Sequence, residues 1–357
     1  MPVELRCSLK RISILAAVIL FQFATSSLAQ SPNAFLPGPK PADIPVEWKG
    51  LIGSYGSKDK PFLIVEEDEG LKVILPVIDK MPLVKVGKDL FRGGSPDLPL
   101  WFKFNLDGRG IATRLSHSGE VLSRIKEGPE EGHPFQIIAQ HPIEQLRQQA
   151  LAASPPTETG SFHKPELVEL APLDSSIHLD IRYATSNDFF GTPVYSQARA
   201  FLQRPAADAL VRLQKRLKQL GYGLLIHDAY RPWYVTKIFW DATPPEGKIF
   251  VADPAQGSRH NRGCAVDLTL YDLATGKAIE MPGTYDEMSP RSFPDYPGGT
   301  SLQRWHRDLL RRAMESEGFT VYEAEWWHFD FKDWREYPIL NVPFEKLGPG
   351  EVSAPVH

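Results

Sequence analysis

Apolar residues are spaced in two different ways along the chain, and the pattern changes after a short helix and a linker, at about Glu166. In the first part, short runs of β-branched and aromatic residues alternate with turn signals such as Glu69-Gly70 and Asp107-Gly108. Five runs predict strands, at residues 62–65, 71–75, 83–86, 100–104 and 111–115. Together they predict a small all-β domain, an antiparallel sheet or small barrel, between residues 48 and 125.

The second part mixes helical and strand patterns. Before it, Ile143, Leu146, Ala150 and Leu151 stand at helical spacing and predict a short helix, which a proline and threonine cluster follows. Further along the chain, the spacing predicts helices at residues 206–220 and 302–317, and strands at residues 168–170, 177–181, 222–228, 264–270 and 319–331. This order of elements predicts an α+β domain with a largely antiparallel central sheet.

The first 29 residues have the pattern of a secretory signal peptide. Basic residues precede an apolar run over residues 12–24, and the small residues Ser27 and Ala29 stand where a signal peptidase cleaves. The run is shorter than the roughly 20 residues of a spanning helix, and no later stretch approaches that length. We therefore expect secretion across the inner membrane into the periplasm, with no membrane span after cleavage. A retained signal anchor is the alternative.

Composition and charge narrow the classes of function. The chain has 42% hydrophobic and 24% charged residues, as soluble globular proteins do. Its formal net charge of −4 combines both signs, so we expect neither a nucleic-acid partner nor a polybasic membrane surface. Removal of the predicted signal peptide leaves Cys264 as the single cysteine, so no intramolecular disulfide can form. Stability then depends on apolar cores.

These patterns divide the chain into six parts. The parts are a signal peptide (1–29), a proline-rich tether (30–47), an all-β accessory domain (48–140), a helix and linker (141–165), the domain with the candidate chemistry (166–345) and a C-terminal tail (346–357). The β domain contains the pattern Gly53-Ser54-Tyr55, Leu71-Lys72-Val73, Phe91 and Phe104-Asn105-Leu106-Asp107-Gly108. In this pattern it resembles small all-β modules that are appended to bacterial extracytoplasmic hydrolases. It contains His117 but no cluster of ligands, which favours an accessory or packing role over a second active site.

A histidine and an aspartate stand seven positions apart between Gly257 and Thr269. Residues 257–263 are polar and bounded by glycines, which indicates a loop, and the following residues are apolar enough for a buried strand. His260 and Asp267, at the two ends of this loop and strand, could converge on one metal ion. From this segment alone, His260 could also be an ordinary loop histidine and Asp267 a capping residue.

A second group of candidate residues, Glu325 to His328, lies near the end of the chain. A hydrolytic zinc site needs three protein ligands, an open position for water and a nearby carboxylate that takes a proton. His328 can be the third ligand and Glu325 the base. Glu325 and His328 are three positions apart, and in a flat strand such positions point to opposite faces. A bend or bulge therefore has to bring them to one site, and the bulky side chains of Trp326 and Trp327 could cause it. Mixed nitrogen and oxygen ligands favour zinc, although other divalent metals remain open.

Arg231 and Cys264 each allow two interpretations. Arg231 follows a buried strand and precedes Pro232, which holds it outside regular structure. Its guanidinium could face a developing oxyanion or form a surface salt bridge. Cys264 could be a zinc ligand or a nucleophile beside His260. A thiol in an apolar strand usually packs in the core, however, and Asp267 would then lack a role.

Together, these segments resemble the VanX-type D-alanyl-D-alanine dipeptidases, zinc enzymes related to D,D-carboxypeptidases and to the hedgehog signalling fold. The resemblance covers residues 172–341. It rests on Ser-x-His-x-x-Gly-x-Ala-x-Asp from Ser258 to Asp267, Glu-Trp-Trp-His from Glu325 to His328, Asp-x-Tyr-Arg-Pro from Asp228 to Pro232, and the stretch of residues 182–191.

The resemblance implies a zinc D,D-peptidase domain with a hedgehog-like fold and one zinc ion per chain. It implies that His260, Asp267 and His328 bind the metal. Glu325 is then the general base and later the acid, and Arg231 polarises the scissile carbonyl. The expected reaction is hydrolysis of D-Ala-D-Ala.

The resemblance also implies a substrate pocket, with Asp286 holding the free ammonium group. The other residues that we assign to substrate binding are Tyr183, Ser258, Trp326 and Trp327. A carboxylate at a fixed distance from the metal admits only short peptides with a free amine, so the expected partner is a small D-amino-acid dipeptide. The alternative for Asp286 is a turn cap.

Alternative functions are a D,D- or L,D-carboxypeptidase acting on peptidoglycan peptides and a non-catalytic wall-binding protein. The β domain could contact the cell wall or a protein, and the sequence does not indicate an oligomeric state.

Overall fold

The computed structural model describes residues 32–76, 78–131 and 135–348, and these described residues belong to one compact unit. The predicted signal peptide and all but the first three residues of the predicted C-terminal tail lie outside the described residues. Within the described ranges, no helix is both long enough and apolar enough to cross a membrane.

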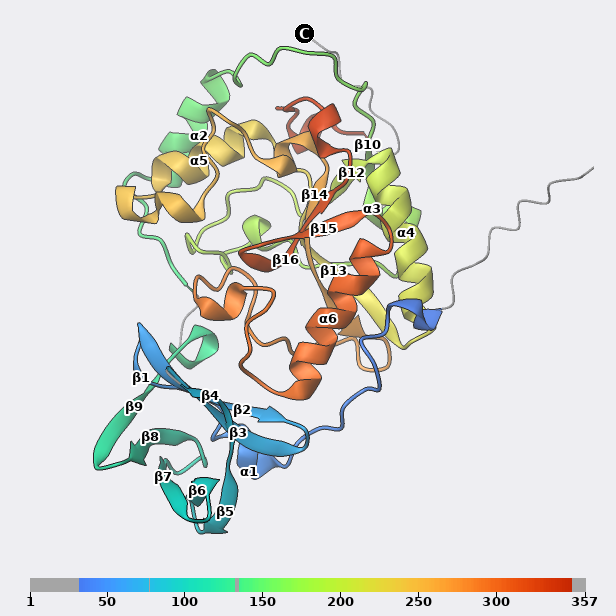
Figure 1. Cartoon of the computed structure of the whole chain (residues 1–357). Coiled ribbons are helices and arrows are strands. Elements are labelled where there is room, and N and C mark those ends of the chain that lie inside the picture. Colours follow the sequence, from blue (N-terminus) through green and yellow to red (C-terminus); the bar gives the residue numbers. More distant parts are fainter. Residues whose placement is uncertain (1–31, 77, 132–134, 349–357) are drawn as a thin grey trace, which may run out of the picture. The chain divides into compact units, whose positions relative to one another are not determined.

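Nine antiparallel strands form one sheet in the N-terminal part of the described chain (Figure 1). Their order is β4-β3-β2-β1-β9-β8-β7-β6-β5. The strands are β1 (Gly53–Ser57), β2 (Lys60–Glu67), β3 (Gly70–Leu75), β4 (Ile78–Pro82), β5 (Val84–Gly87), β6 (Leu90–Ser95), β7 (Leu98–Leu106), β8 (Ala112–His117) and β9 (Glu120–Ile125). The two edge strands, β4 and β5, are separated in sequence only by Leu83, and β4 contacts β6. The sheet is therefore nearly closed, as the prediction of a barrel-like domain requires.

Side chains that alternate along these strands fill the interior of the sheet. Tyr55, Val73, Phe102 and Leu115 are fully buried there, in an apolar cluster separate from the core of the second domain. His117 stacks on Phe102 with ring centroids 4.4 Å apart, a packing contact. The sequence did not reveal four of the strands, β1, β4, β6 and β9, because glycines and charged residues interrupt their apolar patterns.

The C-terminal part contains a five-stranded sheet in the order β11-β13-β14-β16-β15. Its strands are β11 (His178–Leu179), β13 (Tyr222–Asp228), β14 (Ala265–Asp272), β15 (Phe319–Tyr322) and β16 (Glu325–Phe331). Only the β11–β13 pair is parallel, so the predicted α+β class with a largely antiparallel sheet is confirmed. A separate two-stranded sheet pairs β10 (Leu167–Glu169) with β12 (Phe201–Gln203).

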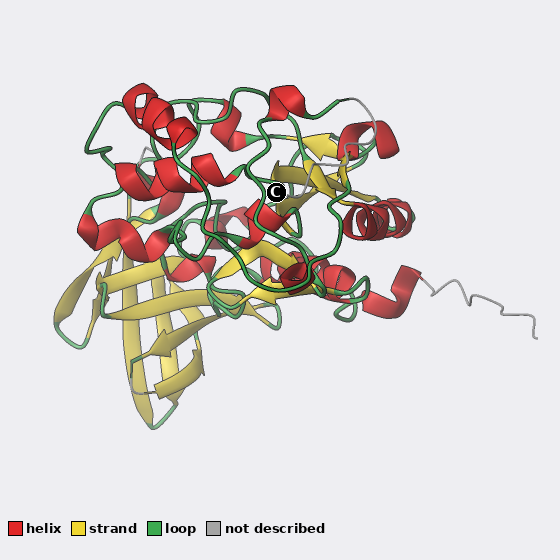
Figure 2. Ribbon diagram, turned by 90° about the horizontal axis from the view of Figure 1, so that it is seen from above, coloured by secondary structure: helices red, strands yellow, loops and turns green. Residues whose placement is uncertain are grey.

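Helices surround this smaller sheet, as the colouring of Figure 2 shows. The longer ones are α2 (Ile143–Ala152), α4 (Arg204–Lys218), α5 (Trp233–Ala242) and α6 (Ser301–Glu315), and α3 (Leu170–Leu173) is a single turn. The one-turn helix α1 (Val46–Lys49) belongs instead to the nine-stranded part, where Trp48 packs against its core. Thr300 and Gln303 form a capping box that starts α6. Leu151, grouped by spacing with the buried residues of α2, is 52% exposed, because it lies about 100° around the helix from Ala150.

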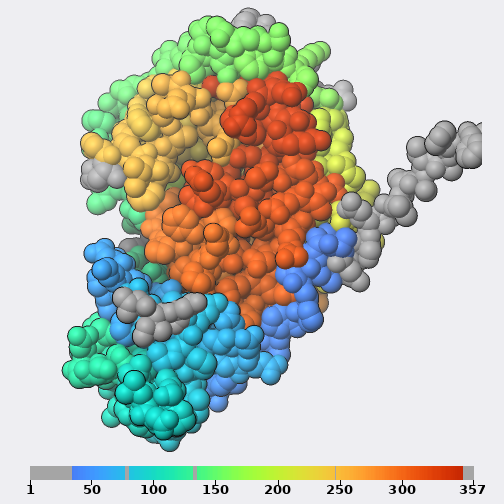
Figure 3. Space-filling view, viewed as in Figure 1, coloured from blue at the N-terminus to red at the C-terminus, as the bar shows by residue number. Residues whose placement is uncertain are grey.

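The segment of the predicted tether that precedes the nine-stranded sheet packs against α4 and α6, and Figure 3 shows it in blue beside the orange surface of the later residues. Phe35 is buried, and the guanidinium of Arg216 on α4 lies 4.6 Å from its ring centroid. The indole of Trp305 on α6 donates to the Gly38 carbonyl at 3.1 Å. Lys40 donates to the hydroxyl of Tyr222 at 2.7 Å. Side-chain contacts therefore hold this segment at several points.

Candidate functional site

Neighbouring strands of the five-stranded sheet bring the three predicted metal ligands together. Asp267 on β14 is the register partner of His328 on β16. His260 lies on the short helical turn Arg259–Arg262, directly before β14, and Gly263 ends that turn in the left-handed conformation with φ 67°. This reversal of the chain lets the loop histidine return to the strand that carries Asp267.

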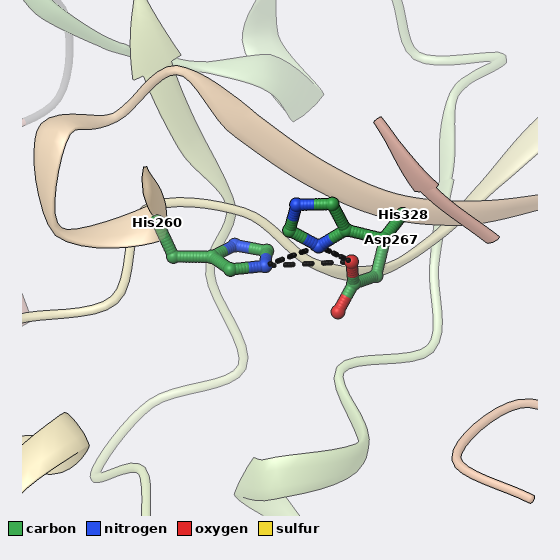
Figure 4. Close-up of side chains that lie close together, drawn as sticks. All are labelled: His260, Asp267 and His328. Atoms are coloured by element: carbon green, nitrogen blue, oxygen red, sulfur yellow. Dashed lines mark hydrogen bonds and ion pairs between the residues drawn. The ribbon is translucent and has the colours of Figure 1, made fainter. Parts of the chain in front are cut away.

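The inward-facing atoms of these three side chains almost touch. His328 Nδ1 lies 2.9 Å from Asp267 Oδ1 and 3.1 Å from His260 Nε2, and His260 Nε2 lies 3.4 Å from Asp267 Oδ1. Figure 4 shows both rings turned towards the carboxylate. All three residues are buried, and their ligand atoms lie within 4.8 Å of one another.

Hydrogen bonds on the outer side of each ring fix which nitrogen faces inwards. His260 Nδ1 donates a hydrogen bond to the Ala229 carbonyl at 2.7 Å, which leaves Nε2 free for a metal. His328 Nε2 lies 3.1 Å from Asp330 Oδ1 and donates to it, which leaves Nδ1 free. Arg259 in turn donates to Asp330 Oδ2 at 2.8 Å. Two imidazole nitrogens and one carboxylate oxygen are a donor set that fits Zn²⁺.

The charges at this cluster also favour a cation. Burial opposes ionisation of Asp267, but His260 and His328 hold the pKa of its carboxyl well below the usual range. Burial lowers the pKa of His328, yet hydrogen bonds to Asp267 and Asp330 outweigh it and raise that pKa to about 10. The cluster thus contains an ionised carboxylate, and its hydrogen bonds make the His328 ring more basic, as a ligand to a cation should be.

A bulge at the start of β16 brings Glu325 to the same site as His328. Val321 pairs with Phe329, but the next residue of β15, Tyr322, pairs with Glu325, so the extra residues of β16 bulge out of the ladder. Glu325 Oε2 lies 3.9 Å from His328 Nδ1. Burial raises the pKa of the Glu325 carboxyl, and the nearby His328 opposes that rise. The irregularity that the sequence required is present.

Trp326 and Trp327, predicted as substrate-binding residues, are buried at 3% and 0% exposure. Neither lines the cavity at the metal ligands. The ring of Trp327 packs edge-on against Tyr285, with ring centroids 5.6 Å apart. The structure therefore places the two indoles in the core behind the site.

A cavity of about 670 Å³ opens onto the metal ligands. Its walls contain most of the other predicted site residues: Tyr183, Arg231, Ser258, Asp286 and Glu325. Ser258 caps the turn that carries His260, and its hydroxyl accepts from the His260 amide at 3.2 Å. Ser258 therefore supports a metal ligand as well as lining the cavity.

Arg231 is held rigidly in the cavity wall. Its Nε and Nη2 donate to Asp228 Oδ2 at 3.1 and 2.7 Å, and Asp228 is fully buried. Tyr195 donates to the other oxygen of Asp228 at 2.6 Å. Burial opposes the charge on Arg231, but Asp228 raises the pKa of the guanidinium well above its usual value. The pair is a buried ion pair rather than the surface salt bridge that the sequence left open.

Asp286 lies in the loop between β14 and α6 and has a left-handed backbone, with φ 55°. Its Oδ2 accepts from the Tyr183 hydroxyl at 2.9 Å. Burial, followed by the nearby carboxylates of Asp267 and Glu325, raises the pKa of Asp286 well above its usual value. A substrate ammonium group beside Asp286 would relieve this concentration of negative charge.

Sequence reasoning assigned no role to three residues that support the site. Asp330 stands two positions after His328 on the same face of β16, a spacing that could have revealed it. Asp228 belonged to a recognised motif, although its bond to Arg231 was not foreseen. Tyr285 donates to Asp267 Oδ2 at 3.2 Å from a distant loop, and no local pattern indicates that contact.

Replacing Cys264 by serine is expected to leave activity and metal content nearly unchanged. Cys264 is fully buried, its thiol donates to the Arg262 carbonyl at 3.6 Å, and the three-residue ligand cluster does not include it. Burial raises the pKa of the thiol, which disfavours a thiolate ligand or nucleophile. Metal analysis and dipeptide hydrolysis by the purified variant test this expectation. Loss of the metal would show that the thiol is a ligand.

Comparison with known proteins agrees with this site. Residues 163–345 match the family model described as D-ala-D-ala dipeptidase. The D-alanyl-D-alanine dipeptidase of Escherichia coli is 35% identical over 186 residues, which cover 52% of this chain and 95% of the relative. The enzyme of the same name from Streptomyces coelicolor is 36% identical over 179 residues, with 45% and 89% covered. That of Enterococcus faecalis is 36% identical over 193 residues, with 48% and 95% covered.

The matched region contains the metal-ligand cluster, Glu325, Arg231 and Asp286, and it excludes the nine-stranded sheet. Through residues 163–345, the chain belongs to the D-alanyl-D-alanine dipeptidase family.

Proposed function

We propose that this protein is a zinc-dependent dipeptidase that hydrolyses D-Ala-D-Ala. The observation that carries the proposal is the shared cavity, which combines a buried His-Asp-His ligand set with a carboxylate base and a second carboxylate suited to an ammonium group. His260, Asp267 and His328 would hold one ion per chain. The names of the family's relatives support the choice of substrate.

In the proposed reaction, zinc supplies Lewis acidity at the scissile carbonyl and at the attacking water. Glu325 takes the proton of that water and later delivers it to the leaving amine, a task that suits a carboxyl whose pKa burial has raised. The guanidinium of Arg231 faces the oxyanion, and its bonds to Asp228 hold it there without reorganisation.

Acylation of the substrate amine is expected to reduce kcat/KM by at least about 10-fold, because a charge-assisted hydrogen bond to Asp286 is lost. Tyr183 and Asp286 already form a hydrogen-bonded pair at the cavity wall, where an ammonium group would be the third partner. Hydrolysis of free D-Ala-D-Ala by the zinc-loaded chain should be compared with that of N-acetyl-D-Ala-D-Ala and of longer peptides ending in D-Ala-D-Ala.

Equal turnover of free and acylated peptides would favour the alternative function, a D,D-carboxypeptidase that acts on peptidoglycan peptides. Binding of wall fragments without any turnover would favour the non-catalytic alternative. An Asp286→Asn variant is a second test, since it should lower turnover of the free dipeptide more than that of any acylated substrate.

We also propose that the enzyme acts in the periplasm and that its catalytic domain has the hedgehog-like arrangement of related D,D-peptidases. The apolar run at residues 12–24 supports the location, and the largely antiparallel five-stranded sheet supports the fold. Cell fractionation with an antibody against the chain tests the location.

A further inference from the structure

The loop that carries Asp286 needs support from outside itself. Asp286 is the one residue between Gly283 and Pro290 with a positive φ, a conformation that side chains other than glycine adopt unwillingly. Its neighbour Glu287 organises the loop. The Glu287 carboxylate accepts from the amide and hydroxyl of Thr284, both at 2.9 Å, and from the hydroxyl of Ser289 at 2.7 Å. The position of Asp286 therefore depends on where Glu287 lies.

Arg291 connects Glu287 to the end of the nine-stranded sheet. Its Nε lies 3.1 Å from Glu287 Oε1 and also donates to the Pro282 carbonyl at 2.9 Å. Its Nη1 donates to the carbonyl of Glu127 at 3.4 Å. Glu127 follows β9, and its own carboxylate accepts from Ser54 on β1 at 3.0 Å. One guanidinium thus joins the Asp286 loop to the β1–β9 edge of the accessory domain.

The backbone of Gly128 also passes close to the Asp286 loop. It has a left-handed φ of 55°, and a Cβ added to it would lie 2.8 Å from Cδ of Glu287. Real Cβ atoms do not approach other atoms so closely, and Thr284, Ser289 and Arg291 hold this carboxylate, so a Cβ at residue 128 would force the carboxylate or the backbone to shift. Gly128 and Glu287 are therefore packed in direct contact.

The same sheet is attached to the second domain at another place. Glu66 on β2 is 3% exposed, and its carboxylate accepts from the backbone amide of Ser301 at 2.7 Å, in the first turn of α6. Arg304 donates to the Glu66 carbonyl at 2.6 Å. With this second attachment, the sheet can serve as a fixed support for the loop.

We propose that the accessory β domain positions the substrate-binding loop, with Gly128, Glu287 and Arg291 as the positioning residues. Through them, the junction after β9 sets where Asp286 meets the substrate ammonium. The inference rests on the proposed function, in which Asp286 binds the free amine. The β domain then helps to select dipeptides with a free amine, in addition to any contact that it makes with the cell wall or another protein.

The first test compares two alanine variants in the full zinc-loaded chain. Gly128→Ala introduces the clash with Glu287. Gly119→Ala is the matched control, because Gly119 also has a positive φ, 85°, at the β8–β9 turn, but a Cβ there would meet no atom within 4 Å. Gly128→Ala should raise KM for free D-Ala-D-Ala about 10-fold with kcat nearly unchanged, as expected when binding of the amine weakens. Arg291→Met should do the same.

A second measurement does not depend on turnover. Hydrogen–deuterium exchange of peptides covering residues 283–290 should be faster in Gly128→Ala and Arg291→Met than in Gly119→Ala, because the loop loses its support. If loop exchange and KM in both variants match those of Gly119→Ala, the positioning proposal is wrong. A fall in kcat at constant KM would likewise contradict it, since that indicates a smaller folded fraction.

Failure of the proposed function gives a different result. If the unmodified chain does not hydrolyse D-Ala-D-Ala, the proposed function is wrong, and the exchange comparison alone then decides whether the β domain supports the loop. Faster exchange at residues 283–290 would support the coupling even in that case, and unchanged exchange would overturn it.

Discussion

Replacing Glu325 by glutamine is expected to lower kcat about 10²- to 10⁴-fold, the usual effect of removing a general base. Glutamine preserves the size of the side chain but cannot take a proton from water. Because Glu325 is not one of the three ligands and lies 3.9 Å from His328 Nδ1, the bound metal should remain. Steady-state hydrolysis of D-Ala-D-Ala and metal analysis of the same sample check both parts.

Glu323→Gln is the matched control for this experiment. Glu323 is an exposed residue two positions earlier in the turn between β15 and β16, so its variant carries the same change of charge near the same strand. It should retain full activity. Unchanged activity in Glu325→Gln would require another base, and loss of metal would indicate that Glu325 is itself a ligand.

Replacing Asp267 by asparagine is expected to remove both metal binding and activity. Asp267 supplies the one carboxylate of the ligand set and lies within 3.4 Å of both inward-facing imidazole nitrogens. An amide oxygen carries no negative charge, so the two imidazoles would have to hold the cation alone. The loss of affinity should exceed the roughly 10- to 100-fold that follows removal of a partner hydrogen-bonded to a ligand.

Asp330→Asn gives the smaller effect for comparison. Asp330 accepts from His328 Nε2 without reaching the metal position, so its variant should weaken metal binding by about 10- to 100-fold only. Asp272→Asn, at the far end of β14, should bind metal normally. Metal titration of the three variants by calorimetry should give this order. Equal affinity in Asp267→Asn and Asp272→Asn would remove Asp267 from the ligand set.

The sequence predicted which candidate ligands lie together better than it predicted the elements around them. The cluster of His260, Asp267 and His328 could be found because few residue types can bind a metal and because these three stand in recognisable motifs. The bulge at Glu325 could be inferred from the spacing of Glu325 and His328, which conflicts with a flat strand. For the candidate ligands and for the bulge, the requirement that side chains meet at one metal ion left few possible arrangements.

Contacts between distant segments explain what the sequence did not reveal. The stretch that forms α5, from Trp233 to Ala242, is rich in aromatic and β-branched residues and has no strong helical preference, yet it is helical and packs against α2. Tyr285 reaches Asp267 only because its loop folds back over β14. Neither arrangement can be deduced from a local pattern of apolar residues.

The packed segment before the nine-stranded sheet changes how that sheet is linked to the rest of the enzyme. Contacts at Phe35, Gly38 and Lys40 hold the chain before β1, and the contacts of Glu127 and Gly128 hold it just after β9. The chain segments directly before and directly after the sheet are therefore both held by contacts with the domain that contains the candidate site. If the contacts of Glu66 with Ser301 and Arg304 opened, the two anchors would keep the local concentration of the sheet high, so these contacts would form again.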